Sequence, residues 1–231
     1  MHPDLTGQVV LITGATGALG ETVTRVFLEA GATVGGVARS WAGKQKPPRF
    51  VPLEADLTQP DAAKRVVSSL VESAGRLDVV VHVMGGFAGG QPVQETTDAT
   101  WNGMMAMNLN AAFFVLRAGL AHMVPSGKGR IIAIGSRAGV DQGPNLSAYN
   151  VSKAGLHALV RTAAAEVKDS EITVNAVLPS TIDTAVNRSA MPAADFSKWV
   201  KPESIGASLL WLASDESKDI NGALIPIYGR A

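Results

Sequence analysis

The 231-residue sequence contains no cysteine. Disulfide scaffolds, thiolate metal sites and cysteine nucleophiles are therefore excluded for this chain, and we predict no metal site. A protein of a reducing compartment needs no disulfides, and the first ten residues have no basic segment followed by an apolar one. We therefore expect a cytoplasmic protein.

A net charge is also lacking, because 20 Lys and Arg residues balance 20 Asp and Glu residues. This balance argues against binding to nucleic acid or an anionic membrane through bulk charge. No apolar run approaches the roughly 18 residues expected of a membrane span. We expect neither nucleic acid nor membrane among the partners.

Six short apolar runs, rich in Val and Ile, alternate with segments of helical spacing. The runs lack a polar face, as expected of strands buried on both sides of a parallel sheet. They comprise residues 9–12, 34–37, 79–81, 131–134, 172–178 and 224–227. The alternation predicts a single α/β domain over residues 1–231, with a Rossmann-type doubly wound parallel sheet of about seven strands and helices on both faces.

A glycine loop follows the first predicted strand and precedes a helix. Gly14 allows a tight turn, the small residues after it let a pyrophosphate approach the backbone, and Gly20 permits close packing of helix and strand. The helix amino terminus offers free N–H groups to phosphate; a plain tight turn is the alternative. The loop lacks the lysine of an ATPase-type phosphate loop. The candidate cofactor-binding residues here are Gly14, Thr16, Gly17, Ala18, Leu19 and Gly20.

The end of the second strand favours one cofactor over another. An NAD site usually places an acidic residue there, whereas this chain has Arg39 and Ser40, followed by Lys44, Lys46 and Arg49. Arg39 and Ser40 are suited to hold a 2′-phosphate through charge-assisted hydrogen bonds; a solvated basic loop is the alternative. We expect NADP(H) to be preferred, with NAD(H) also possible.

Tyr149 and Lys153 are spaced to share one helical face. A lysine ammonium beside a phenol lowers the tyrosine pKa from about 10 and suits it to acid/base chemistry. Ser136 ends a predicted strand 13 residues earlier, where its hydroxyl is expected to hydrogen-bond a substrate carbonyl.

These residues resemble the short-chain dehydrogenase/reductase family over nearly the whole chain. The loop 13–20, Asn108, Ser136 and the Tyr149–Lys153 pair match its motifs in order, as do Asp56 and Leu57 at the adenine. The resemblance implies that Tyr149 exchanges a proton with the carbonyl oxygen and that Lys153 lowers its pKa and binds the nicotinamide ribose. It further implies that Ser136 orients the carbonyl and that Asn108 holds a relay water. Additional cofactor contacts are expected at Val83, Gly85, Pro179, Ile182 and Thr184.

The chain departs from the family pattern after the fourth strand. The usual Asn-Asn-Ala-Gly is replaced by residues 82–85, so we expect the bracing asparagines to be lost and His82 to be a core histidine. A Gly-Gly-Phe-Ala-Gly-Gly run follows, in which Phe87 is suited to stack on a flat substrate. This run and residues 187–199 more narrowly resemble dihydropteridine reductase, although Ser136 and Arg39 do not fit that likeness. Met191, Phe196 and Trp199 can alternatively just pack a short helix over the site.

The favoured interpretation is an NADP(H)-dependent reductase of a ketone or related carbonyl. A quinonoid dihydropteridine reductase-like enzyme is the second hypothesis, and a non-catalytic nucleotide-sensing protein is the third. Substrate choice is expected to depend on the loops at about 85–92 and 184–201. From the resemblance we also expect a homodimer or homotetramer formed through helices at about 101–123 and 148–168.

Overall fold

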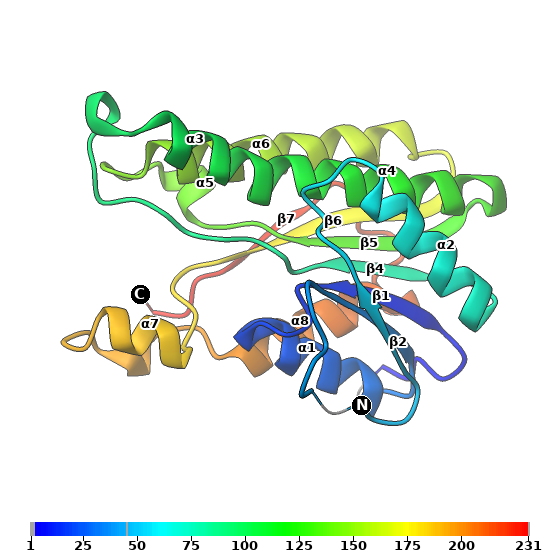
Figure 1. Ribbon diagram of the computed structural model, residues 1–231. Coiled ribbons are helices and arrows are strands. Elements are labelled where there is room, and N and C mark those ends of the chain that lie inside the picture. The colour runs from blue at the N-terminus through cyan, green and yellow to red at the C-terminus, as the bar shows by residue number, and fades with distance from the viewer. Residues whose placement is uncertain (1–2, 45, 231) are drawn as a thin grey trace.

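The computed structural model describes residues 3–44 and 46–230. Seven parallel strands form one sheet in the order β3-β2-β1-β4-β5-β6-β7. They are β1 (Val9–Thr13), β2 (Thr33–Ala38), β3 (Phe50–Glu54), β4 (Val79–His82), β5 (Lys128–Ile134), β6 (Glu171–Pro179) and β7 (Leu224–Ile227). Helices cover both faces of this sheet (Figure 1), which confirms the predicted Rossmann-type fold.

Six of the strands contain the six predicted apolar runs, and β3 is the strand that the runs omit. It lies at the edge of the sheet, pairs only with β2, and carries Pro52 in its middle. Proline is tolerated in an edge strand because one side of the strand makes no ladder hydrogen bonds. Since most of β3 is only half-buried, it lacks the continuous apolar signal of the central strands.

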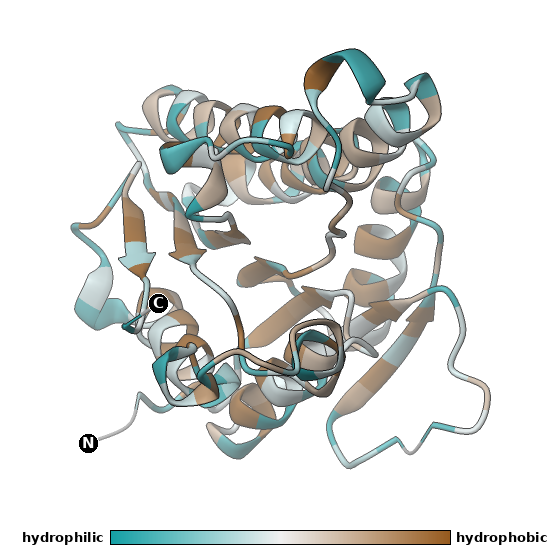
Figure 2. Cartoon of the chain, turned by 90° about the vertical axis from the view of Figure 1, so that its left-hand side faces the viewer, coloured by the Kyte–Doolittle hydropathy of each residue, from teal (hydrophilic) through white to brown (hydrophobic). Residues whose placement is uncertain are grey.

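Two apolar cores lie on opposite faces of the sheet. One core packs under α2 (Ala62–Ala74), α4 (Ala111–Met123) and α6 (Ser147–Glu166), and the other under α1 (Ala18–Glu29) and α8 (Pro202–Ala213). Figure 2 views the sheet from the strand ends, with the hydrophobic strands between the two helical layers. Neighbouring side chains on a central strand therefore belong to different cores: Val80 faces α4, whereas Val81 faces the α1 and α8 side.

The long helix predicted near residues 101–123 is interrupted. It consists of α3 (Asp98–Met104), a π-helical segment η2 (Met105–Asn110) and α4. π-Helical turns are frequent at functional sites because they redirect side chains, and η2 carries the buried Asn108. The second long helix agrees closely with its prediction, since α6 spans Ser147–Glu166.

Taken together, the helical segments from Asp98 to Ser126 are long and apolar enough to cross a membrane, by length and composition alone. Polar residues such as Asn108 and Arg117 interrupt this stretch, so it contains no unbroken apolar run of about 18 residues. The inner side of α4, including Ala112 and Leu116, is buried in the core beneath it, which is the position of a core helix.

The short elements lie mostly around the carboxyl ends of the strands. They include α5 (Ala138–Asp141) and α7 (Ala185–Ala190), with short 3-10 turns at Val93–Glu95, Val124–Ser126, Phe196–Lys198 and Asp215–Ser217. The strand order reverses between β1 and β4. Open α/β sheets bind ligands at such a switch point, outside the carboxyl ends of the strands.

Candidate active site

The glycine loop between β1 and α1 lies at the switch point and requires glycine at two positions. A Cβ atom on Gly14, whose φ is +66°, would lie 2.9 Å from the Cα atom of Met84, and one on Gly20 would lie 2.0 Å from the Gly14 carbonyl oxygen. Helix α1 begins after Gly17, which caps it without a side-chain hydrogen bond. Its first N–H groups are therefore suited to a phosphate, and the loop fits the pyrophosphate of a dinucleotide.

Thr13 joins the carboxyl ends of β1 and β4. Its Oγ1 atom accepts hydrogen bonds from the N–H groups of Val83 and Met84, both at 3.1 Å, and lies 3.0 Å from Nδ1 of His82. Burial, together with the positive charge of Lys153, lowers the pKa of His82 to about 3, so its ring is neutral. With both hydroxyl lone pairs engaged, Thr13 donates to Nδ1.

His82 is fully buried, as predicted for a core histidine. The expectation that bracing polar side chains are lost here was incomplete, because the Thr13–His82 hydrogen bond supplies a brace between the two strands.

The end of β2 presents Arg39 and Ser40 to solvent. The positive charge of Arg39 contributes to a lowered pKa of Asp56, although hydrogen bonds from Thr58 are the larger cause. Arg39 and Asp56 therefore lie on the same side of the sheet end, around the expected adenosine site. Leu57 beside them is buried.

Two of the cations that follow Arg39 in the sequence, Lys44 and Arg49, contact other groups. The Arg49 guanidinium donates to the Leu28 carbonyl at 2.8 Å, and Lys44 forms an ion pair with Glu21 at 2.7 Å. Lys44 and Arg49 are thus engaged with other groups, and Arg39 is the cation that lies directly at the end of β2.

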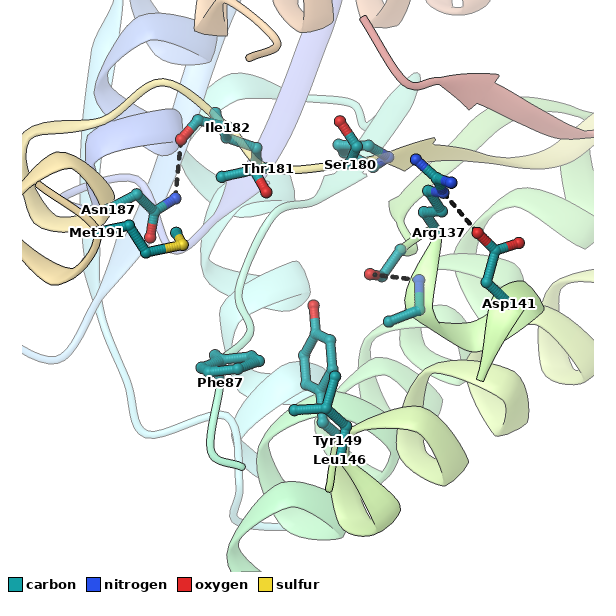
Figure 3. A pocket seen from close by; sticks show the side chains of 13 residues that line it. Phe87, Arg137, Asp141, Leu146, Tyr149, Ser180, Thr181, Ile182, Asn187 and Met191 are labelled. Carbon is teal, nitrogen blue, oxygen red and sulfur yellow. Dashed lines mark hydrogen bonds and ion pairs between the residues drawn. The ribbon is translucent and has the colours of Figure 1, made fainter. Parts of the chain in front are cut away.

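Ser136 and Tyr149 line one pocket with a volume of about 460 Å³ (Figure 3). The Tyr149 ring projects into the pocket, with Phe87 on one side and the segment after β6 opposite. The Ser136 hydroxyl accepts a hydrogen bond from the Ala138 N–H at 3.2 Å, which leaves its own hydrogen to donate. The remaining lining consists of Arg137, Ala138, Asp141, Leu146, Pro179, Ser180, Thr181, Ile182, Asn187 and Met191.

The pKa of Tyr149 is raised, contrary to the sequence-based prediction. Burial of the phenol disfavours its anion, and the Ser136 hydroxyl opposes this effect only in part. The prediction failed because Lys153 Nζ donates to the carbonyl of Ile134 at 2.9 Å rather than to the phenol. In this arrangement Tyr149 is a protonated phenol at neutral pH. Phe87 contacts it edge-on, with ring centroids 5.0 Å apart.

Lys153 and Asn108 lie together beside the Gly85 backbone, and both are buried. Burial lowers the pKa of Lys153 to about 8. The Asn108 side chain forms two hydrogen bonds with the backbone of Gly86: it accepts from the N–H at 2.8 Å and donates to the carbonyl at 3.1 Å. A Cβ atom on Gly85 would lie 3.0 Å from Asn108 Oδ1 and 3.4 Å from Lys153 Nζ, so the Gly85 backbone borders both groups.

The segment after β6 is bound tightly to the start of α8. Ile182 pairs with Val200, and Thr184 caps α7 by accepting from the Asn187 N–H. Asp183 forms ion pairs with both Arg188 and Lys201, and its own side chain is only 5% exposed. These contacts hold α7 against the rest of the protein and direct Asn187 and Met191 toward the pocket (Figure 3).

The segment over the site packs partly against itself. The ring centroids of Phe196 and Trp199 lie 4.8 Å apart, and Trp199 is buried. Met191 instead is 42% exposed and lines the pocket. The packing alternative therefore describes Phe196 and Trp199, whereas Met191 is available to a ligand.

Three site residues escaped the sequence analysis although signals for them existed. Asn187 lies in the segment associated with the site, but its contact with the Ile182 carbonyl at 2.8 Å is visible only in three dimensions. His157 follows Lys153 by one helical turn, and its Nε2 atom accepts the Ser136 N–H at 3.3 Å. Arg137 was overlooked despite directly following Ser136.

Comparison with known proteins agrees with this geometry. A family model described as short chain dehydrogenase matches residues 8–195. The chain is 30% identical to the 3-oxoacyl-(acyl-carrier-protein) reductase FabG of Thermotoga maritima, with 97% of this chain and 98% of that protein covered. It is 32% identical to galactitol 2-dehydrogenase of Rhizobium johnstonii, with 96% and 94% covered.

Solved structures show the same fold. "ElxO with NADP Bound" superposes with a TM-score of 0.90 at 24% identity and covers 96% of this chain and 97% of its own. The crystal structure of gox2181 gives a TM-score of 0.88 at 25% identity, with 98% and 96% covered.

Proposed function

This chain belongs to the short-chain dehydrogenase family, and on that premise we propose that it is an NADP(H)-dependent reductase of a ketone or related carbonyl compound. The observation that carries the proposal is the convergence of Ser136 and Tyr149 on one pocket, together with a buried Lys153 and Asn108 that meet beside the Gly85 backbone. A purely nucleotide-sensing protein has no need of this set.

The preference for NADP(H) is proposed from Arg39. It is exposed at the end of β2, where an acidic residue would select NAD, and no acidic residue lies between Glu29 and Glu54. A guanidinium suits a 2′-phosphate because it offers several N–H donors in a fixed plane. The structural neighbour ElxO is described with NADP bound, which supports the same assignment. Gly14, Thr16, Gly17, Ala18, Leu19 and Gly20 would hold the pyrophosphate side, and Ser40, Asp56, Leu57, Val83 and Gly85 the adenosine side.

When bound, the reduced nicotinamide supplies the hydride; the protein's own residues handle the proton and the orientation. Tyr149, protonated because burial raises its pKa, donates a proton from Oη to the substrate oxygen. Ser136 donates a hydrogen bond to the same oxygen and fixes its position. Lys153 and Asn108 hold the polar side of the site, where a lysine with a pKa near 8 is suited to return a proton to Tyr149.

Pro179, Ile182 and Thr184 would border the nicotinamide. Pro179 ends β6, and the other two lie on the segment that links β6 to α7. The lysine also lies beside the Gly85 backbone, which supports the proposal that it binds the nicotinamide ribose.

The pocket favours a substrate with a bulky apolar or aromatic group beside the carbonyl. Phe87, Leu146, Ile182 and Met191 supply its apolar lining. Two of them belong to the segments 85–92 and 184–201, to which we assign substrate selection. Phe87 is 68% exposed, and its edge-on contact with Tyr149 leaves a face for a flat ring. That exposed ring also supports a quinonoid dihydropterin as the alternative substrate.

The test is NADPH and NADH oxidation followed at 340 nm with a fixed panel: butanone, acetophenone, menadione and quinonoid dihydropterin. We expect acetophenone to exceed butanone in kcat/KM, and NADPH to exceed NADH. Turnover restricted to the dihydropterin would establish the alternative. Binding of NADPH without oxidation by any member of a widened carbonyl panel would favour a sensing protein.

We also propose a homo-oligomer located in the cytoplasm. The long helices α3, η2–α4 and α6 expose Trp101, Phe113 and Val151, each by 40% or more. Exposed apolar side chains gathered on helices are typical of subunit interfaces. Light scattering coupled to size exclusion distinguishes a monomer from the expected dimer or tetramer.

A further inference from the structure

The turn that carries Ser136 is built around a histidine. His157 lies on α6, one helical turn after Lys153, and is 5% exposed. Its Nε2 atom accepts a hydrogen bond from the backbone N–H of Ser136 at 3.3 Å. This is the contact by which α6 reaches the backbone of the serine itself.

Two glycines make room for the imidazole. A Cβ atom on Gly135 would lie 2.6 Å from His157 Nε2, and one on Gly139 would lie 2.6 Å from Cε1. Both distances are far below normal contact, so the ring fits between these residues only because neither has a side chain. The imidazole therefore packs against the serine turn on both sides of Ser136.

The ring has the correct protonation state for its contact. Burial lowers the pKa of His157 to about 4, with smaller contributions from the positive charges of Lys153 and Arg161. At neutral pH the imidazole is uncharged, and Nε2 offers a lone pair to the Ser136 N–H while the proton resides on Nδ1. A protonated ring would have no lone pair to offer.

Two other hydrogen bonds of Ser136 stay within its own turn. The Ser136 carbonyl accepts from the Gly139 N–H at 3.1 Å, and its hydroxyl accepts from the Ala138 N–H at 3.2 Å. These bonds shape the turn but do not fix it relative to α6. The Ser136 hydroxyl also interacts with the Tyr149 phenol, but the contact from His157 is the one that joins the serine backbone to α6, the helix that carries Tyr149 and Lys153.

We propose that His157 is a positioning residue: by accepting the Ser136 N–H, it sets the distance between the Ser136 hydroxyl and Tyr149 and thereby tunes proton donation to the substrate oxygen. This inference rests on the proposed function, since it presupposes that Ser136 and Tyr149 act on one carbonyl. It assigns no contact with substrate to His157 itself.

The test compares H157L, which removes the acceptor at similar size, with H157Q, whose side-chain oxygen reaches a similar position. With the fastest-reduced carbonyl of the panel, we expect H157L to lower kcat about tenfold, because a buried N–H loses its partner. H157Q should recover kcat to within about threefold, and the Kd for NADPH should change less than twofold in both. H122L, on a half-buried histidine of α4 outside the pocket, is the matched control and should leave kcat unchanged.

A double-mutant cycle separates positioning from general damage. In an S136A background, we expect H157L to lower kcat by less than about twofold, because the group that it positions is already absent. Amide exchange of Ser136, measured by NMR on the cofactor-free protein, should accelerate at least tenfold in H157L and remain slow in H157Q. If H157L does not fold, H157N, whose amide is one carbon shorter than that of H157Q, takes its place in each comparison.

The proposal is overturned if H157L costs the same factor with and without Ser136, or if the Ser136 amide exchanges at the wild-type rate in H157L. Failure of the proposed function has a different signature, namely S136A and Y149F that both turn over at the wild-type rate.

Discussion

Replacing Lys153 with methionine should make the folded protein more stable than the wild type at neutral pH. This advantage should shrink at high pH. The lysine is 4% exposed, and burial lowers its pKa from 10.5 to about 8. At about 1.4 kcal/mol per pKa unit, the charged lysine costs the folded protein about 3 kcal/mol below pH 8. Methionine has a similar length and carries no charge to desolvate.

The direction of the pH dependence follows from proton counting. Between about pH 8 and 10.5, an unfolded lysine is protonated while the buried one has lost its proton. The unfolded chain therefore binds one more proton, and the contribution of Lys153 to stability rises with pH across this window. The K153M variant lacks this contribution, so its stability advantage should shrink by about 3 kcal/mol from pH 7 to pH 10.5.

The assay is urea unfolding of both proteins at pH 7 and pH 10.5, at one protein concentration and with matched slopes. Loss of the hydrogen bond to the Ile134 carbonyl affects the variant at both pH values. The stability difference between the two proteins is therefore taken at each pH, and the change of this difference from pH 7 to pH 10.5 reports the charge of Lys153. A difference in unfolding free energy between K153M and the wild type that is the same at both pH values would refute the reasoning. K128M, at an exposed lysine whose ion pair with Glu171 is solvated, is the matched control and should show little change.

Three further substitutions test other parts of the site. R39D should lower the ratio of kcat/KM for NADPH over NADH at least tenfold, because a guanidinium is replaced by a carboxylate beside the expected 2′-phosphate; an unchanged ratio contradicts the assignment. D183N should raise the carbonyl KM severalfold with a smaller effect on kcat, since α7 loses its ion pairs; steady-state kinetics with unaltered KM argue against a role in holding the lining. G20A should lower the Tm by roughly 2–10 °C, because its Cβ meets the Gly14 carbonyl at 2.0 Å. G17A, which meets that oxygen at 3.3 Å, should change the Tm far less.

Much of the architecture was predictable because the central strands are buried on both faces. Residues such as Val10 and Ile132 have no solvent-facing side and therefore form unbroken apolar runs. The edge strand β3 does have a solvent-facing side, and its half-buried residues and Pro52 weaken the apolar pattern of its sequence. The π-helical segment around Asn108 was not predictable, since its sequence differs little from that of an ordinary helix.

The site was predictable to the extent that its residues form local motifs. The glycine loop and the Tyr149–Lys153 spacing are short-range patterns whose geometry follows from one turn and one helix. The electrostatics of the site were not predictable in this way, because they depend on tertiary structure. The raised pKa of Tyr149 arises from burial, and Lys153 donates to a carbonyl on β5. His157 was missed for the same reason, because its partner lies 21 residues away.

The most direct test of the central claim is a single-turnover experiment on Y149F. Oxidation of bound NADPH is followed at 340 nm with the carbonyl that the wild-type enzyme reduces fastest, and the Kd for NADPH is measured by fluorescence. If Tyr149 donates the proton, the rate falls at least a thousandfold while the Kd stays within about twofold. Oxidation by Y149F at the wild-type rate would contradict the account.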